Sequence, residues 1–157
     1  MDSVDQQLLD LLQEDCKMTI KELAQKLNLT STPVFERIKR LEENGYIDSY
    51  SAVLNRKKLG LNLQVFCNIS LKQHQSDSLQ KFETDILKFP EVLSCHHLTG
   101  NYDYLLMILV EDMESYQHFV TRKLAQLEDI GKVHSQFVMT EVKPFKGYPV
   151  KHLNPVL

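Results

Sequence analysis

Hydrophobic residues in the first 28 positions recur every three or four residues, the spacing of helices that bury one face. The first stripe follows Asp2 and Ser3, either of which can cap a helix. Residues 19–22 read Thr-Ile-Lys-Glu, a capping box that predicts the start of a second helix. Asn28 tolerates left-handed backbone geometry and can end that helix. The two predicted stripes are Val4, Leu8, Leu11 and Leu12, and then Ile20, Leu23, Ala24 and Leu27.

A third helix is predicted almost immediately afterwards, with Thr30 or Ser31 as its cap and Gly45 beyond its end. So short a connection between the second and third helices is typical of a helix-turn-helix arrangement, in which the third helix enters the major groove of DNA. Any three-helix bundle could have the same connection. The exposed face of the third helix must therefore distinguish a DNA-binding helix-turn-helix from an ordinary bundle. Its apolar stripe is Val34, Ile38 and Leu41.

The face opposite that stripe carries hydroxyl and charged side chains, given a rotation of about 100° per residue. Hydroxyls in the first turn followed by cations are what phosphate and base-edge contacts require. A solvated charged face would look the same, Arg37 could instead pair with a carboxylate of its own domain, and Glu36 fits a groove only where it accepts from cytosine. We predict base-edge or groove-lining roles for Ser31, Thr32, Glu36 and Arg40, and phosphate contacts for Arg37 and Lys39.

The segment after the third helix changes character. Residues 46–54 predict a short strand, and residues 56–60 form a basic link without a glycine–serine run, which favours a semi-rigid hinge. Arg56, Lys57 and Lys58 could contact the DNA backbone or simply be solvated. The predicted division is a helix-turn-helix domain over 1–48, a strand and hinge over 49–62, and a second domain over 63–157.

Strands and helices alternate from residue 63 onward. The two-residue period of 63–71 predicts a strand, Pro90 ends a helix that carries Leu79 and Phe82, and Asp112 can cap another helix. The order β-α-β-β-α-β is the ferredoxin-like pattern, an α+β fold with two helices on one face of an antiparallel sheet. Further strands are predicted over 92–98, 104–110 and 133–142, with a turn at 99–101.

The second face of that sheet is also predicted to be buried. Phe66 stands on the nominally polar side of the first strand, and Tyr104–Val110 shows no polar alternation. Because nothing within the chain is left over to cover this face, we predict a homodimer packed sheet against sheet.

Composition and charge narrow the class of protein. The chain has 157 residues, 43% hydrophobic and 25% charged, as in an ordinary folded protein. Its net charge of −3 excludes a protein that is basic throughout, although Pro33–Lys58 carries six basic and four acidic residues. Three cysteines, no signal peptide and an apolar run no longer than Leu105–Val110 predict reduced thiols, a cytoplasmic location and no membrane span.

No pattern in the chain predicts catalysis or metal binding. Neighbouring strand residues point to opposite faces, so Cys95 and His97, but not His96, can share a side, which is too few ligands for a closed zinc site. Nucleophile elbows, phosphate loops, HExxH motifs and paired carboxylates do not occur. We therefore expect no metal, no cofactor and no enzymatic activity.

Residues 29–47 read Leu-Thr-Ser-Thr-Pro-Val-Phe-Glu-Arg-Ile-Lys-Arg-Leu-Glu-Glu-Asn-Gly-Tyr-Ile, with further short matches at 19–24, 50–55, 99–106 and 139–143. In this order they resemble the Lrp/AsnC family of feast/famine transcription regulators. The resemblance implies an N-terminal winged helix-turn-helix domain for double-stranded DNA and a C-terminal ferredoxin-like domain that dimerises and senses amino acids. It further implies a tetramer of dimers, and a sequence-specific regulator whose assembly and DNA binding respond to a small effector.

An amino-acid effector fits best at the loop 99–104. Gly100 allows backbone N–H groups to approach a carboxylate, and Asp103 can pair with an ammonium group. A plain β-turn capped by Asp103 is the alternative. With the residues that the resemblance suggests as a pocket border, the predicted effector-binding set is Gly100, Asn101, Tyr102, Asp103, Tyr104, Met113, Met139 and Thr140.

Two other functions share this architecture. Sirohaem decarboxylase subunits have the same two domains and need histidine or arginine around a tetrapyrrole, and this chain has His96, His97 and Arg122. An architectural chromosome protein would wrap DNA and ignore small molecules. The tail 145–157 is longer and more apolar than the family pattern needs, which suggests packing on a neighbouring subunit.

Overall fold

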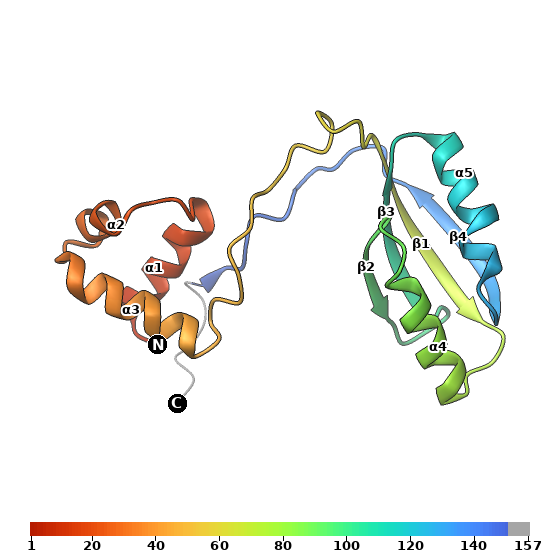
Figure 1. The fold of residues 1–157 in the computed structure, drawn as a ribbon, viewed down its shortest axis with the longest axis horizontal. Coiled ribbons are helices and arrows are strands. Elements are labelled where there is room, and N and C mark those ends of the chain that lie inside the picture. Colours follow the sequence, from red (N-terminus) through yellow and green to blue (C-terminus); the bar gives the residue numbers. More distant parts are fainter. Residues whose placement is uncertain (151–157) are drawn as a thin grey trace. The chain divides into compact units, whose positions relative to one another are not determined.

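The computed structural model describes residues 1–150, and its contacts divide the chain into two compact units (Figure 1). One unit contains Met1–Val53 together with the chain from Lys143 onward, and the other contains Leu54–Val142. We call them the N-terminal unit and the sheet unit. Among residues 1–150, no helix combines the length and the apolarity needed to cross a bilayer.

The helices of the N-terminal unit begin and end close to their predicted positions. The Thr19 hydroxyl and the Glu22 carboxylate form the predicted capping box, with the N–H of Thr19 donating to Glu22 over 2.7 Å. Asn28 ends its helix in the left-handed region at φ 54°, which keeps the next connection short. Thr30 caps the third helix, although its side chain makes no capping hydrogen bond. The three helices are α1 (Ser3–Glu14), α2 (Ile20–Leu27) and α3 (Ser31–Glu43).

The core of the N-terminal unit lies where these helices meet. Leu8 and Val34 are completely buried, and Leu23 and Leu41 are almost so. These residues belong to the stripes predicted from spacing, so the local pattern located this core. Val150 is buried in the same cluster, although it comes from the other end of the described chain.

Residues 143–150, which we call the strap, attach to α1 through Gln13. The side-chain amide of Gln13 accepts the N–H of Tyr148 over 2.6 Å and donates to the Tyr148 carbonyl over 3.1 Å. Gly147 has a φ of +113°, and a Cβ there would collide with the Gln13 side chain. From the sequence, these residues were predicted to belong to the C-terminal domain, and the tail was predicted to pack on a neighbouring subunit. The described part of the tail packs on α1 of its own chain. Residues 151–157 lie outside the described part.

Residues 46–54 form no strand, so the strand predicted for this segment is wrong. No residue of that segment belongs to a sheet; the N–H groups of Tyr46 and Ile47 donate to the Leu41 carbonyl and close the end of α3. The Tyr50 hydroxyl donates to Glu42 over 2.8 Å. A strand needs a neighbour that takes up its backbone hydrogen bonds, and within residues 1–150 this segment has none.

The sheet unit has the predicted β-α-β-β-α-β order, and all pairs in its sheet are antiparallel. The strands are ordered β2-β3-β1-β4, so the first and third strands along the chain are the central ones. This is the ferredoxin-like arrangement predicted from the alternation of elements. In chain order the elements are β1 (Leu63–Leu71), α4 (Ser76–Ile86), β2 (Val92–His97), β3 (Tyr104–Val110), α5 (Met113–Arg122), the 3₁₀ turn η1 (Leu124–Gln126) and β4 (Ile130–Phe137).

The last strand starts and ends earlier than predicted, because β4 covers 130–137 rather than 133–142. Asp129 turns the chain with a φ of 65°, and its carbonyl accepts the N–H of Lys72 over 2.7 Å. A Cβ on Gly131 would lie 3.0 Å from the Ser70 carbonyl oxygen, so glycine allows the two strands to approach there. Neither effect is part of a two-residue hydrophobic period.

The two faces of the sheet have different surroundings. Helices α4 and α5 pack on one face, where alternate residues of β1 such as Val65, Cys67 and Ile69 are fully buried (Figure 1). On the other face, the register places Phe66 opposite Met107 and, further along, Leu105 opposite a polar β1 residue. No helix of the described sheet unit covers this second face.

Candidate DNA-binding surface and effector site

The outer face of α3 is exposed, as the helical rotation predicted. Ser31, Thr32, Glu36, Lys39 and Arg40 are all exposed. Lys39 lies 3.6 Å from the Glu43 carboxylate, a solvent-exposed i,i+4 pair that restrains the cation only weakly. The hydroxyl-bearing first turn and the cations of the following turns are therefore accessible on one side of this helix, which is the side that a groove would contact.

Two arginines of α3 are engaged by carboxylates of α1 and its cap. Arg37 Nη1 lies 2.7 Å from Asp2 and 2.6 Å from Asp5, and Arg40 Nη2 lies 3.0 Å from Asp5. Contacts with Asp2 and Asp5 raise the pKa of the Arg37 guanidinium above its ordinary value. We call Asp2, Asp5, Arg37 and Arg40 the Asp5 cluster.

In the Asp5 cluster, Arg37 pairs with carboxylates of its own domain, which was the alternative left open for it. The phosphate contact of Arg37 stays a prediction, and only 24% of the Arg37 side chain is exposed. Sequence reasoning did not identify Asp5 as the partner. The available signal was its position in the first turn of α1, where the N–H of Asp5 donates to Asp2 and the N–H of Asp2 donates back to Asp5.

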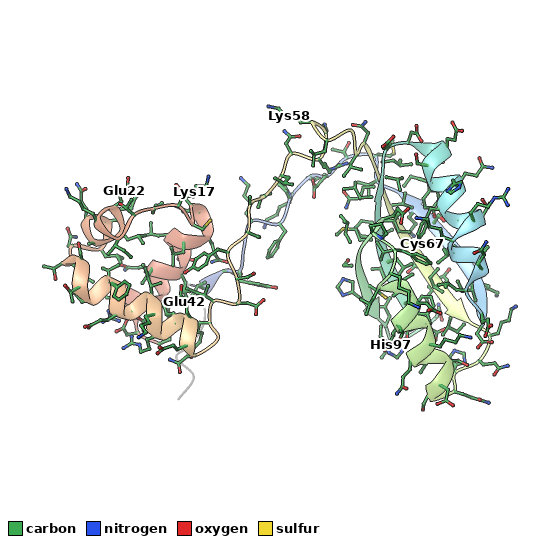
Figure 2. The ribbon with its side chains drawn as sticks, viewed as in Figure 1. Lys17, Glu22, Glu42, Lys58, Cys67 and His97 are labelled. Carbon is green, nitrogen blue, oxygen red and sulfur yellow. The ribbon has the colours of Figure 1, made fainter. Side chains whose placement is uncertain are left out.

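The basic link lies in the sheet unit and forms a turn. Leu61 donates its N–H to the Arg56 carbonyl over 2.9 Å, and the Arg56 guanidinium reaches back to the Leu61 carbonyl over 3.4 Å. Lys57 and Lys58 are exposed, and Lys58 extends from this turn in Figure 2. Arg56 thus has a local structural contact, while both lysines are available to an anionic partner.

In the loop 99–104, the Asp103 carboxylate holds the loop to the end of β1. One of its oxygens accepts the N–H of Leu71 over 2.7 Å, and the other lies 3.0 Å from His74 Nε2. Gly100 has a φ of +121°, a conformation that favours glycine. Within the described chain, the N–H groups of Gly100 and Asn101 donate to no protein acceptor. The loop therefore offers free backbone donors, while its carboxylate is already hydrogen-bonded.

An open hollow of about 340 Å³ lies beside this loop. Asn101 and Tyr102 of the predicted set line it, and the Tyr102 ring stacks on His134 with centroids 6.1 Å apart. Lys132 also lines the hollow, and sequence reasoning did not identify it because the last strand was predicted to begin at residue 133, just after Lys132. The full lining is Ser70, Leu71, Asn101, Tyr102, Gly131 and Lys132.

The structure does not bring all predicted effector residues together. Tyr104 is 1% exposed, and its hydroxyl donates to Glu83 over 2.8 Å, so this side chain is part of the core. Met113 follows the opposite end of β3, which is about 20 Å from the loop for a strand of seven residues. Met139 and Thr140 follow the end of β4 at that same edge of the sheet and are exposed. Within one chain they cannot border the hollow at loop 99–104.

Residues 1–150 contain no cluster of three or more side chains suited to hold a metal ion. Cys67 is fully buried on the helix-covered face, and burial raises the pKa of its thiol (Figure 2). Burial and the nearby Glu83 raise the pKa of Cys95 to about 11. The His97 ring stacks on Tyr104 at 4.7 Å between centroids. The two cysteines therefore have structural surroundings rather than the open, thiolate-favouring surroundings of a reactive site.

Both units match known protein families. A model of the winged helix-turn-helix DNA-binding type matches residues 1–48, and a model of the Lrp/AsnC ligand binding domain matches residues 64–148. The DNA-binding transcriptional activator DecR of Escherichia coli K12 is 36% identical over 151 residues, covering 96% of this chain and 99% of DecR. The leucine-responsive regulatory protein of the same strain is also 36% identical over 151 residues, covering 96% of this chain and 92% of that protein.

Solved structures agree with these matches. A transcriptional regulator from Neisseria meningitidis in complex with L-Met superposes with a TM-score of 0.93 at 35% identity, covering 97% of this chain and 98% of that one. An AsnC-family regulator from Agrobacterium tumefaciens gives a TM-score of 0.93 at 34% identity, covering 98% of this chain and all of the other.

The fold and the exposed face of α3 define a DNA-binding transcriptional regulator that carries a separate ligand-binding domain. The chain belongs to the Lrp/AsnC family. Its relatives and matched domains are transcriptional regulators and not enzymes, so the tetrapyrrole-decarboxylase alternative has no support from them.

Proposed function

We propose that this regulator binds DNA through the outer face of α3 and that an amino acid bound at the loop 99–104 controls its DNA binding and assembly. The observation that carries the effector proposal is the fixed loop beside an open hollow, with free backbone N–H groups at Gly100 and Asn101. The L-Met complex of the Neisseria regulator supports an amino acid as the class of ligand. We also propose a cytoplasmic location, since the DNA lies there.

In the DNA complex, Ser31, Thr32, Glu36 and Arg40 line the groove and Lys39 contacts phosphate. Lys39→Ala should weaken binding to every duplex and reduce the slope of log K against log salt by about 0.9 for each α3 that contacts DNA. A salt titration of the full chain measures this slope. Lys88→Ala in the sheet unit is the control, and an unchanged slope in Lys39→Ala would contradict the phosphate assignment.

The uncovered sheet face supports a homodimer. Its apolar centre consists of Phe66, Leu105 and Met107. The same face of a second copy, related by a two-fold axis, would bury these side chains. Two copies of α3 would then read two half-sites of a pseudo-palindromic operator. From the family resemblance we also propose that dimers assemble further into a tetramer of dimers.

For the effector, the N–H groups of Gly100 and Asn101 and the Lys132 ammonium suit a carboxylate. Asp103 can bind the ligand's ammonium group if the ligand displaces His74 from one oxygen of the Asp103 carboxylate. The other oxygen would keep its hydrogen bond from the N–H of Leu71. Met113, Met139 and Thr140 can border the same pocket only when another copy of the chain supplies them, because they lie at the opposite end of the sheet.

Two measurements test the effector proposal. Calorimetry of the full chain with each of the twenty amino acids should give heat with at least one of them, and Lys132→Ala should weaken that binding. Footprinting on the DNA upstream of the chain's own coding region should then change when that amino acid is added. Silence from all twenty, with a footprint that never changes, would contradict the proposal and favour the architectural alternative.

A further inference from the structure

Asp5 is the only charged residue that is buried in residues 1–150, at 2% exposed. Its Oδ1 accepts Arg37 Nη1 over 2.6 Å and Arg40 Nη2 over 3.0 Å. Its Oδ2 accepts the same Arg40 nitrogen over 3.1 Å and the N–H of Asp2 over 3.0 Å. A buried carboxylate is costly unless it is paired and fully hydrogen-bonded, and Asp5 is both.

The two arginines held by Asp5 are left in different states. Arg37 donates to Asp2 and Asp5 and has 24% of its side chain exposed. Arg40 is 55% exposed and donates through Nη2 alone. Within the described residues, the Nη1 and Nε donors of Arg40 have no acceptor. The Arg37 guanidinium is thus paired inside the domain. The Arg40 guanidinium is held through Nη2, and its Nη1 and Nε donors are free to bind.

The charges of the cluster cancel, since two carboxylates face two guanidinium groups. Cations that contact phosphates raise the affinity for every DNA sequence equally, whereas an oriented donor at a base edge raises it for one sequence. Holding Arg37 against two carboxylates removes a cation from the first role. Fixing one side of Arg40 suits the second role, because a pre-positioned guanidinium loses less side-chain freedom when it binds.

We propose that Asp5 is a positioning residue for sequence recognition: it withholds Arg37 from the DNA backbone, in place of the phosphate contact predicted from the sequence, and it orients Arg40 so that the free donors of Arg40 meet a base edge. The proposal rests on the proposed function of α3 as the groove-contacting helix. Asp5 itself touches no DNA in this account. It acts through Arg40, and its effect is on the ratio of specific to non-specific binding.

The test is Asp5→Asn in the full chain, with two duplexes as probes. One is the duplex that the wild-type protein selects from a random pool, and the other is a shuffled duplex of equal composition. Loss of the Asp5 charge should weaken binding to the selected duplex about tenfold, within the range for one lost base contact. It should tighten binding to the shuffled duplex and steepen the salt slope by about 0.9 for each cation released to the backbone.

Two variants show whether Arg40 carries the effect. Asp2→Asn removes a partner of Arg37 but leaves Arg40 untouched, so it should leave the affinity ratio of the two duplexes within about twofold of wild type. In an Arg40→Ala background, Asp5→Asn should weaken the selected duplex no further. In a Lys39→Ala background it should keep its full tenfold effect.

Asp5→Asn should change the affinity in opposite directions on the two duplexes, which distinguishes a positioning role from a purely stabilising one. If Asp5→Asn weakens both duplexes by the same factor on every background, Asp5 only stabilises the domain and the proposal is overturned. If Asp5→Asn does not fold, Arg40→Lys takes its place: it keeps the charge, should keep the affinity for the shuffled duplex, and should lose about tenfold on the selected one. An Arg40→Lys protein that discriminates as well as wild type also overturns the proposal. A wild-type protein that binds neither duplex would overturn the DNA-binding proposal for α3 itself.

Discussion

The contacts that stabilise the N-terminal unit differ in kind from those that stabilise the sheet unit. The sheet unit buries an almost wholly apolar cluster, in which Leu106, Ile108 and Phe119 are 0–1% exposed. The N-terminal unit has a smaller apolar core and adds the charged Asp5 cluster between α1 and α3. Apolar burial is non-directional, whereas charged hydrogen bonds fix distances and angles. The unit that presents side chains to DNA is the one that has a buried carboxylate paired with two arginines between its helices.

The largest expected effect comes from the two cores. Leu106→Ala should lower the unfolding free energy of the sheet unit by about 2–5 kcal/mol, because it removes a fully buried side chain. Leu8→Ala should do the same to the N-terminal unit. Scanning calorimetry of the full chain would show each variant lowering a different transition. A joint shift of both transitions would mean that the two cores unfold as one.

The second effect concerns the uncovered sheet face. Phe66→Asp places a charge in the centre of the proposed dimer interface and should weaken dimerisation by about 30-fold or more, the effect of losing an aromatic hot spot. Sedimentation velocity over a range of concentrations measures the shift. Leu87→Asp on the exposed end of α4, where Leu87 is 84% exposed, is the control. If both variants sediment like wild type, the dimer does not use this face.

A smaller effect is expected at the strap. Gln13→Ala removes two hydrogen bonds to Tyr148 and should cost the N-terminal unit about 1–2 kcal/mol, with the sheet unit unchanged. Urea unfolding followed by a probe in each unit measures the difference. Gln73→Ala, at an exposed position of the sheet unit, is the matched control. Equal stability of Gln13→Ala and wild type would show that the strap contact adds nothing to the fold.

The smallest effect is a pH dependence. Hydrogen bonds from Thr19 lower the pKa of the Glu22 carboxyl in the N-terminal unit, and the N–H of Ser115 lowers that of Asp112 in the sheet unit. A lowered pKa stabilises the fold above the unfolded value, near 4, and this contribution disappears as the pH falls through the folded value. Glu22→Gln should flatten the acid limb of the N-terminal unit alone, measured by unfolding at pH 3 to 6. Flattening in both units would contradict the assignment.

Sequence reasoning worked where the physics is local. The capping box at Thr19, the left-handed Asn28 and the strand Tyr104–Val110 were all predicted with the observed bounds, because short-range hydrogen bonds and continuous apolar runs define them. The exposed face of α3 followed from helical rotation in the same way.

It did not work where a distant partner decides. In the described part of the chain, no strand pairs with residues 46–54, and β4 starts early because Gly131 permits a close approach to Ser70. The predicted effector residues Gly100 and Met139 lie at opposite ends of the sheet, which only the strand register reveals. Asp5 was missed as the partner of Arg37 because the pairing depends on how α1 packs against α3.

The strap has a consequence for how the protein is made. Helices α1 to α3 leave the ribosome first, but their core also contains Val150, which is translated after the entire sheet unit. Part of the apolar surface of these helices therefore stays uncovered until Val150, beyond the last strand, has been synthesised. The unit that begins to form earliest is completed last, so a ribosome that stalls within the sheet unit would release α1 to α3 without Val150 in their core.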